Sequence, residues 1–331
     1  MSEVITLGEG SGGRLTSRLV QELAGRFGAS DGQKGGYEDC SFISSDLAVT
    51  TDGFTVSPRF FPGGDMGHLS ICGSTNDLAV RGVRPRWLTL GMIIEEGFPR
   101  EELFKIADSA ARLCQQLGVS LVAGDTKVAP RGAAEGLFLN VTALGTRAAK
   151  NELGMKNLAA GDALIITTSP GRHGSVIAAL RYGLDLGGLE SDCAALWPLL
   201  EPLLGLKGLH CMRDCTRGGL GTVLCEWAES TGLGMEIDQA SLPIHPSLEA
   251  ICGILGFDPL YLASEGCALI ACAPQAADKI LSLLKNHPLG REAALIGSVT
   301  KAHGGLAGMK TSIGGTRIID MPIGEILPRI C

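Results

Sequence analysis

Four aspartates in the first half of the chain have the chemistry and the positions of ligands for a hard divalent cation. They are Asp39 at the head of a strand-like run, Asp52 in a Thr-Thr-Asp-Gly segment, Asp77 in an otherwise apolar helix-like run, and Asp125 directly after an apolar strand-like run. Mg²⁺ takes oxygen ligands and usually bridges a few carboxylates to substrate phosphates. Because a buried carboxylate is costly unless it is paired, the sequence predicts cation ligands at Asp77 and Asp125. Asp52 taken alone also fits an ordinary turn residue.

Two glycine-rich loops could bind anions. Residues 8–13 read Gly-Glu-Gly-Ser-Gly-Gly before a helix-like run, and backbone N–H groups in such a loop can hold a phosphate. The segment is neither a Walker A loop nor a Rossmann loop, since no Gly-Lys-Ser/Thr follows and no strand precedes it. A flexible N-terminal arm is an equal alternative. Residues 213–219 (Arg-Asp-Cys-Thr-Arg-Gly-Gly) offer two arginines for bidentate oxyanion contacts, or a structural ion pair beside a helix cap.

A single glutamate and a few histidines are the remaining acid–base candidates. Glu265 stands between a serine and a glycine and separates two apolar runs. It is either a turn residue or a carboxylate in a pocket, where loss of solvent raises its pKa toward the range of a general base. His68, His245 and His287 are isolated in the sequence, and we interpret them as structural.

The last four residues are Pro-Arg-Ile-Cys, and the sequence ends at the thiol of Cys331. Chain ends are loosely held unless something ties them down. A terminal thiol can therefore enter a pocket and afterwards be presented to another protein, which suits a sulfur that carries a chemical group. The alternative is a surface cysteine without function, which is an oxidation liability.

Composition limits the class of protein. The chain has 331 residues, of which 45% are hydrophobic, and a net charge of −7 with no long block of Lys and Arg, so we expect about two domains and no nucleic-acid partner. No apolar run reaches about 18 residues, and the N-terminus lacks the pattern of a signal peptide. Eleven cysteines without a C-x-x-C pair indicate reduced, mostly buried thiols in a cytoplasmic protein.

Hydrophobic periodicity predicts mixed helices and strands in both halves. The expected helices are 14–27, 68–81, 99–117, 174–183, 193–204, 218–232 and 274–286. The expected strands are 40–51, 87–94, 119–123, 137–145, 162–168, 233–238, 267–273 and 293–299. The pattern loosens over 146–161, so we expect two α/β (α+β) domains, 1–150 and 151–320, and a mobile tail, 321–331, that carries Cys331.

Five segments together resemble the HypE family of hydrogenase maturation proteins, which are carbamoyl dehydratases. The segments are FFPGGDMGHLSICGSTNDLAVRG, VAGDTKV, RDCTRGGL, HPLGREAALIG and LPRIC. The resemblance covers essentially the whole chain, and the terminal Pro-Arg-Ile-Cys is its most specific mark. The wider superfamily includes aminoimidazole ribonucleotide synthetase, selenophosphate synthetase and thiamine-monophosphate kinase, which share ATP-dependent activation of an oxygen or a related group but lack this tail.

The resemblance implies the two-domain aminoimidazole ribonucleotide synthetase-like fold. In it, the N-terminal strands of two subunits form a barrel, and the C-terminal domain is a mixed sheet covered by helices. The resemblance also implies a homodimer with ATP in a cleft between the domains. The implied partners are HypF as the carbamoyl donor and the HypC–HypD iron scaffold complex as the cyanide acceptor.

The resemblance also implies roles for individual residues. The cation ligands are Asp39, Asp52, Asp77 and Asp125, which bind Mg²⁺. The nucleotide-binding residues are Gly12, Gly13, Asp52, Asn76, Asp77, Asp125, Thr126 and Lys127. Glu265 matches the base, Lys127 a phosphate-side lysine and Cys331 the modified thiol.

The implied reaction is the ATP-dependent dehydration of an S-carbamoyl group on Cys331 to a thiocyanate, which supplies the cyanide ligand of hydrogenase iron while ATP becomes ADP and phosphate. This chain departs from the family pattern at two places. Residues 264–267 read Ser-Glu-Gly-Cys where the family usually has Asn-Glu-Gly-Lys, and Cys215 stands where Ala or Pro is common. The missing lysine would tune the base differently, and we interpret Cys215 as packing variation.

Two other classes fit the same residues. A superfamily kinase or synthetase that acts on a free small molecule would use the same aspartates without the terminal thiol. A non-catalytic scaffold would bind nucleotide and present its tail to partners without turnover.

Overall fold

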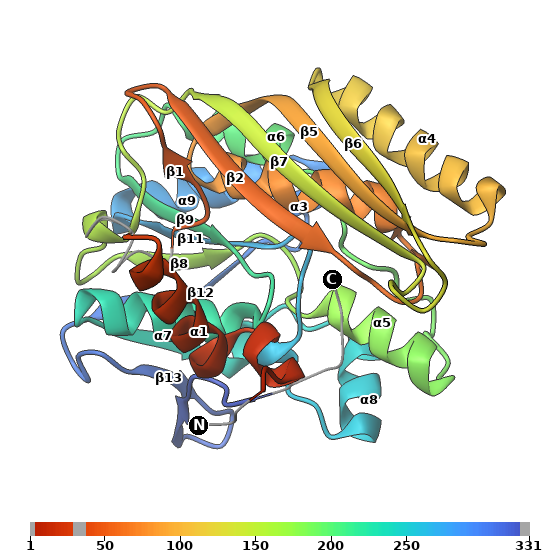
Figure 1. The fold of residues 1–331 in the computed structure, drawn as a ribbon. Coiled ribbons are helices and arrows are strands. Elements are labelled where there is room, and N and C mark those ends of the chain that lie inside the picture. The colour runs from red at the N-terminus through yellow and green to blue at the C-terminus, as the bar shows by residue number, and fades with distance from the viewer. Residues whose placement is uncertain (1–3, 29–37, 325–331) are drawn as a thin grey trace.

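The computed structural model describes residues 4–28 and 38–324, which form two large β-sheets with helices around them (Figure 1). The first sheet has the order β1-β2-β7-β5-β6, and a separate hairpin is formed by β3 and β4. The strands are β1 (Ser41–Phe42), β2 (Leu47–Phe54), β3 (Phe60–Phe61), β4 (Gly64–Asp65), β5 (Val83–Glu95), β6 (Ser120–Ala129) and β7 (Leu137–Arg147). Only the β5–β6 pair is parallel among the pairs of the first sheet.

The second sheet has the order β14-β13-β10-β12-β8-β11-β9. Its strands are β8 (Ala163–Ile166), β9 (Leu209–Asp214), β10 (Gly234–Asp238), β11 (Ala268–Cys272), β12 (Ala294–Thr300), β13 (Ala307–Lys310) and β14 (Thr316–Ile319). The helices are α1 (Gly13–Arg26), α3 (Met66–Val80), α4 (Arg100–Leu117), α5 (Arg172–Tyr182), α6 (Trp197–Leu200), α7 (Gly219–Thr231), α8 (Pro246–Leu255) and α9 (Pro274–Lys285).

Side-chain alternation explains why helices cover both faces of the second sheet. All four residues of β8 are buried, and alternate residues enter different cores. Leu164 and Ile166 face the core that contains α7, whereas Ala163 and Ile165 face the core that contains α6 and α9. Successive side chains of a strand point to opposite faces, so a continuously apolar strand requires a layer on each side.

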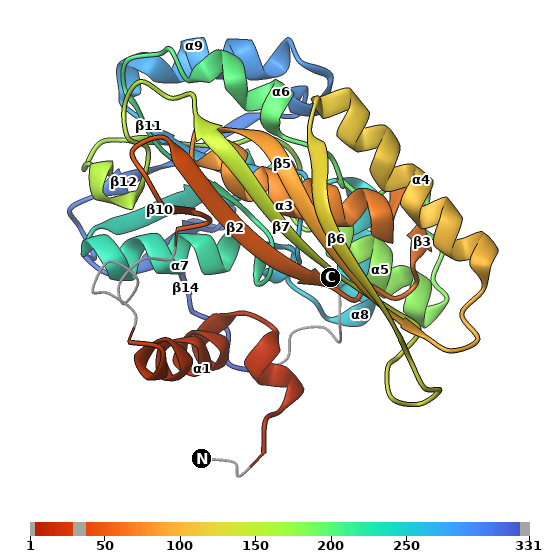
Figure 2. The ribbon, with the colours of Figure 1, turned by 45° about the horizontal axis from the view of Figure 1, so that its top comes forward.

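Helix α3 is the central element of the molecule. It contacts β2, β5 and β7 on one side and β9 and α6 on the other, and Figure 2 shows it behind the first sheet together with α4. Thirteen of its fifteen residues are buried. The other two, His68 and Asp77, are half-buried polar residues, and each belongs to a cluster described below.

The prediction of mixed helices and strands in both halves of the chain, with a mixed sheet covered by helices in the C-terminal half, is confirmed. Several predicted elements differ in extent. The run 40–51 is divided into β1 and β2, and β6 continues beyond the predicted run 119–123 to Ala129, so that Asp125 lies within the strand and not after it. In the run 193–204, residues 193–196 are not helical, and the four residues of α6 are followed by a 3-10 helix, Glu201–Leu203. Pro202 lacks the N–H group that an unbroken α-helix needs. Helix α8 was not predicted, although Pro246 at its first position is a typical helix start.

Within 4–28 and 38–324, every helix is too short or too polar to cross a lipid bilayer.

Replacing a helical glycine by alanine should have opposite effects at two positions, because the added Cβ is crowded at one and free at the other. A Cβ on Gly67 would clash with the carbonyl oxygen of Ile106 in α4, whereas a Cβ on Gly253 in α8 has open space. We expect Gly67→Ala to lower the free energy of unfolding by about 1–3 kcal/mol, and Gly253→Ala to leave it unchanged or raise it by up to about 1 kcal/mol. Urea denaturation measures both, and equal effects would contradict the packing described here.

Candidate active site

Three carboxylates from distant parts of the sequence meet between the two sheets. Asp39 precedes β1, Asp77 lies on α3 and Asp214 ends β9. One carboxylate oxygen of each lies within 4.8 Å of those of the others. The sequence predicts Asp39 and Asp77 as cation ligands. It did not single out Asp214, because the arginines of the same loop suggested an oxyanion site instead.

The acidic cluster carries an excess of negative charge. Burial raises the pKa of Asp39 and Asp77 well above the ordinary range and that of Asp214 to about 6, and the charge of Asp214 further raises the pKa of Asp39 and of Asp77. Arg213 pairs with Asp39 and is shared with Glu226 at 3.2 Å. Because one guanidinium serves several carboxylates, it cannot neutralise the cluster.

The donor set of this cluster fits Mg²⁺. Oδ2 of Asp39 and Oδ2 of Asp214 are buried and have no hydrogen-bond partner among the described residues. Thr50 Oγ1 donates to Asp77 Oδ2 at 2.6 Å, which fixes the orientation of that carboxylate. A hard divalent cation would use the free lone pairs and relieve the repulsion.

Asp52 lies at the rim of the cluster, where the glycine loop and the Arg217 loop meet. Asp52 Oδ1 is 3.6 Å from Arg217 Nη2, and Asp52 also raises the pKa of Asp77 electrostatically. A Cβ on Gly12 would lie 3.2 Å from the backbone carbonyl of Arg217, and a Cβ on Gly13 would clash with the carbonyl oxygen of Pro322. Both glycines have positive φ. The two predicted anion-binding loops therefore contact each other and the segment that leads to the C-terminus.

Glu265 is held in a buried loop beside this region. It is 3% exposed, and burial, followed by the charges of Asp192 and Asp214, raises its pKa well above the usual value. Asn76 Nδ2 donates to the backbone oxygens of Glu265, at 3.2 Å, and of Ala194, at 3.0 Å. Both hydrogens of this amide are thereby used inside the fold, so Asn76 positions the Glu265 loop. Its role in nucleotide binding stays a prediction.

The two departures from the family pattern lie against each other. Cys215 has its pKa raised, first by a hydrogen bond with Cys267 and then by burial. Cys267 Sγ also lies 3.7 Å from the carbonyl oxygen of Thr168. Ser264 Oγ accepts a hydrogen bond from Gly171 N at 2.7 Å. These residues are satisfied internally, so the thiol at position 267 does not replace the charge of the family lysine.

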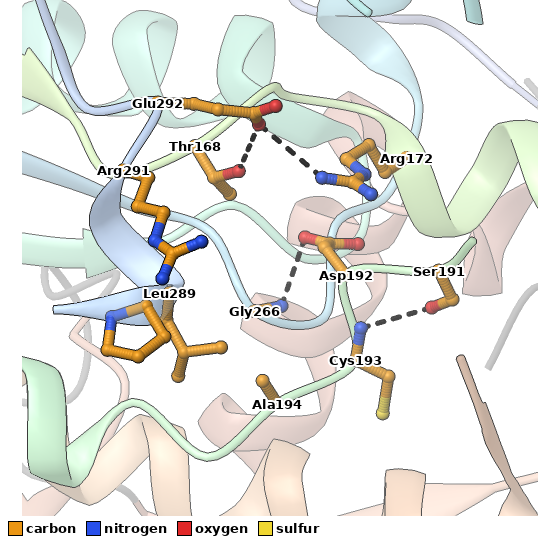
Figure 3. A pocket seen from close by; sticks show the side chains of 11 residues that line it. Thr168, Arg172, Ser191, Asp192, Cys193, Ala194, Gly266, Leu289, Arg291 and Glu292 are labelled. Atoms are coloured by element: carbon orange, nitrogen blue, oxygen red, sulfur yellow. Dashed lines mark hydrogen bonds and ion pairs between the residues drawn. The ribbon is translucent and has the colours of Figure 1, made fainter. Parts of the chain in front are cut away.

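A cavity of about 280 Å³ lies on the other side of the Glu265 loop (Figure 3). Asp192 lines it and accepts hydrogen bonds from Gly266 N at 3.1 Å and His173 N at 3.0 Å. Glu292 accepts from Thr168 Oγ1 at 2.9 Å. These hydrogen bonds hold the segments next to the Glu265 loop in place and so restrict the position of the Glu265 carboxylate.

The predicted residues of β6 lie apart from the cluster within one chain. Asp52 pairs with Val141 on β7, Val141 with Leu90 on β5, and Leu90 with Gly124 on β6. Three strand spacings of about 4.8 Å separate Asp52 from this row of β6, or about 14 Å in all. The exposed residues that follow Gly124 are Asp125, Thr126 and Lys127. The last predicted residue, Cys331, lies outside the described residues.

Comparison with known proteins defines the class. Residues 37–147 match the family described as AIR synthase related protein, N-terminal domain, and residues 159–308 match its C-terminal domain. The chain is 41% identical to carbamoyl dehydratase HypE of Escherichia coli (strain K12) over 336 positions, which cover 99% of each sequence.

Solved structures indicate the same family. The chain resembles a chain of a crystallised HypE–HypF complex with 37% identity and a TM-score of 0.88, covering 92% of this chain and 99% of that one. It resembles a crystal structure of HypE in complex with ATP with 38% identity and a TM-score of 0.83, covering 98% and 100%. The chain belongs to the HypE family of hydrogenase maturation proteins.

The buried acidic cluster predicts a pH dependence of stability that Mg²⁺ reverses. The pKa of Asp214 is about 6 in the folded protein, against an ordinary value of 3.8. Between these values the unfolded chain has lost the proton that the folded chain keeps, so the free energy of unfolding falls as the pH rises from about 4 to 6.

We expect Asp214→Asn to remove this part of the pH dependence and to stabilise the metal-free protein at neutral pH. It should also reduce the stabilisation that added Mg²⁺ gives. Thermal denaturation across pH measures these effects, with the exposed Asp185→Asn as control. An unchanged slope in Asp214→Asn would contradict the assignment.

Proposed function

We propose that this protein dehydrates an S-carbamoyl group on Cys331 to a thiocyanate, with conversion of ATP to ADP and phosphate. The observation that carries the proposal is the position of Pro322. Its carbonyl oxygen accepts from Arg14 N at 3.1 Å, beside the glycine loop and Arg217 at the rim of the acidic cluster. Cys331 is nine residues after Pro322, and an extended chain of that length reaches at most about 30 Å.

Asp39, Asp77 and Asp214 would hold Mg²⁺ against the phosphates of ATP. A cation there supplies charge neutralisation, which phosphoryl transfer needs more than covalent help from the protein. Gly12 lies beside Arg217 and Gly13 beside Pro322. The Gly12 N–H donates to Thr16 Oγ1 at 2.9 Å, so the Arg217 guanidinium is the group that suits the phosphate oxygens, and the two glycines let the loop approach closely. Asp52 would bind at the rim of the same site.

The reaction replaces a poor leaving group by a good one. The carbonyl oxygen of the thiocarboxamide attacks the γ-phosphorus and ADP leaves. The C–O bond then breaks, phosphate departs with the former carbonyl oxygen, and the nitrogen loses both protons to give S–C≡N. Glu265 accepts one of these protons, and the departing phosphate takes up the other. Its raised pKa makes the carboxylate a stronger base than an exposed glutamate.

A second subunit would supply Asp125, Thr126 and Lys127. These residues lie on an edge strand about 14 Å from Asp52 within one chain, and β6 exposes apolar side chains, with Leu121 58% and Val128 67% exposed. An exposed apolar edge strand is a surface that usually pairs or is covered. We propose a homodimer in which the strands of two first sheets form a barrel and each site uses β6 of the partner.

The carrier function also defines the partners. A solved relative forms a HypE–HypF complex, and we propose HypF as the carbamoyl donor of this protein and the HypC–HypD scaffold as the cyanide acceptor. A carrier thiol must stay reduced, which favours the cytoplasm.

Replacing the terminal thiol tests the proposed function. We expect Cys331→Ala to keep the fold and ATP binding but to give no product. Intact-mass spectrometry after incubation with HypF, its carbamoyl source and ATP should show the wild type gaining a carbamoyl group and then losing one water. The control Cys114→Ala, on α4, should behave as the wild type. A dehydrated adduct on the Cys331→Ala chain would contradict the proposal.

Mixed dimers test whether the site is shared. Asp77→Asn and Lys127→Ala should each be inactive. If each site takes these residues from different subunits, random mixing gives one intact site in half of the dimers and about a quarter of wild-type turnover. Asp77 and Glu265 belong to one subunit's site, so mixing Asp77→Asn with Glu265→Gln should restore nothing. Recovery in both mixtures, or in neither, contradicts the shared site.

A further inference from the structure

A second cluster of ligand-type side chains lies on the same helix as Asp77. His68 and Cys72 are four residues apart on α3, and residues with this spacing lie on one face of a helix. Cys193 approaches from the segment between α5 and α6. One ligand atom of each of the three side chains lies within 4.8 Å of the others. The spacing in the sequence gives no hint of this, because Cys193 follows more than a hundred residues later.

The dimensions of the cluster suit a tetrahedral cation. A zinc ion with Zn–S bonds of about 2.3 Å and Zn–N bonds of about 2.0 Å places its ligand atoms about 3.5–3.8 Å apart. The atoms here lie within 4.8 Å of one another and need to approach by at most about 1.3 Å to reach this geometry.

The backbone around the cluster is already fixed. Asp65 Oδ1 caps the first turn of α3 by accepting from His68 N at 3.0 Å. On the opposite side, Ser191 Oγ accepts from Cys193 N at 3.1 Å, and Asp192 is held by two backbone N–H groups. In Figure 3 the sulfur of Cys193 points away from Arg172 and Glu292. Because these groups are already ordered, less conformational entropy is lost when an ion binds.

The cluster is partly open to solvent. Cys72 and Cys193 are buried, while His68 is half-buried, so the cluster is not sealed from solvent on every side.

We infer that His68, Cys72 and Cys193 form a binding site for one thiophilic divalent cation of the Zn²⁺ type, with water in the fourth position. Two sulfurs and one imidazole select such an ion over Mg²⁺, which prefers oxygen ligands. The site is therefore chemically distinct from the acidic cluster. It goes beyond the proposed function and does not depend on it. A bound ion would tie α3 to the loop that carries Ala194, the hydrogen-bond partner of Asn76.

Metal titration of the full chain tests this inference without any activity measurement. The metal-free, reduced protein is titrated with Zn²⁺ against a chromophoric chelator in excess Mg²⁺, and with Co²⁺ for its absorption spectrum. We expect about one ion per chain and a thiolate-to-cobalt charge-transfer band, as in sites with cysteine ligands. Bound Zn²⁺ should also raise the melting temperature.

Matched variants locate the site. Cys72→Ser and Cys193→Ser should weaken Zn²⁺ binding by at least about tenfold and remove the charge-transfer band. Cys252→Ser replaces a thiol that is equally buried but lies on α8, and it should bind Zn²⁺ as the wild type does. Asp77→Asn and Cys331→Ala should also keep the ion, which excludes the acidic cluster and the terminal thiol as its ligands.

Two further measurements test the site if the Cys72 or Cys193 variants fail to fold. His68→Gln alters a half-buried side chain and should weaken binding as well. In the wild type, Zn²⁺ should protect Cys72 from alkylation, as read by peptide mass mapping. Binding that is unchanged in the Cys72, Cys193 and His68 variants, a cobalt complex without the thiolate band, or alkylation of Cys72 that ignores Zn²⁺ would each overturn the inference.

Discussion

The whole arrangement depends on burying three carboxylates at the junction of the two sheets. Asp39, Asp77 and Asp214 come from the start of the first sheet, from α3 and from the last residue of β9, so the cluster exists only when both halves of the chain are folded together. Burial raises their pKa values, and Arg213 offsets only part of the charge. This stored electrostatic cost is what a divalent cation with its nucleotide would relieve, which makes substrate binding and the stability of the domain junction parts of one equilibrium.

Helix α3 connects the acidic cluster to two other parts of the molecule. It is buried almost throughout, and its half-buried residues, His68 and Asp77, each face a cluster of ionisable side chains. Between them, Asn76 fixes the backbone of the Glu265 loop. The acidic cluster, the Glu265 loop and the proposed cation site are thus connected by less than four turns of one helix. A small movement of α3 would therefore shift side chains in all three of these places. The C-terminal segment is held separately, through the contact of Pro322 with the glycine loop.

The local elements could largely be predicted from sequence, because apolar spacing reports burial directly. α1, α4 and β7 lie within a residue or two of their predicted bounds. Asp77 stands out in the sequence because an acid in an apolar run is unusual, and Asp39 is indicated by the family resemblance. Asp214 was missed, since nothing in a one-dimensional pattern brings the end of β9 to α3. The same holds for Cys193, which reaches His68 and Cys72 only through tertiary folding. The residues of β6 behave differently. The sequence marks Asp125 and Lys127 as candidates, but within one chain they lie on an exposed edge strand, away from the acidic cluster.

The central claim is that ATP activates the carbonyl oxygen of a carbamoyl group held on Cys331. The most direct measurement follows that oxygen. The wild-type protein is carbamoylated with a donor whose carbonyl oxygen is ¹⁸O, ATP is added, and the released phosphate is analysed by mass spectrometry. If the carbonyl oxygen is phosphorylated and then expelled, each phosphate formed with thiocyanate must carry one ¹⁸O atom. Phosphate that carries oxygen from the solvent instead, while the label is lost to water, would contradict this account.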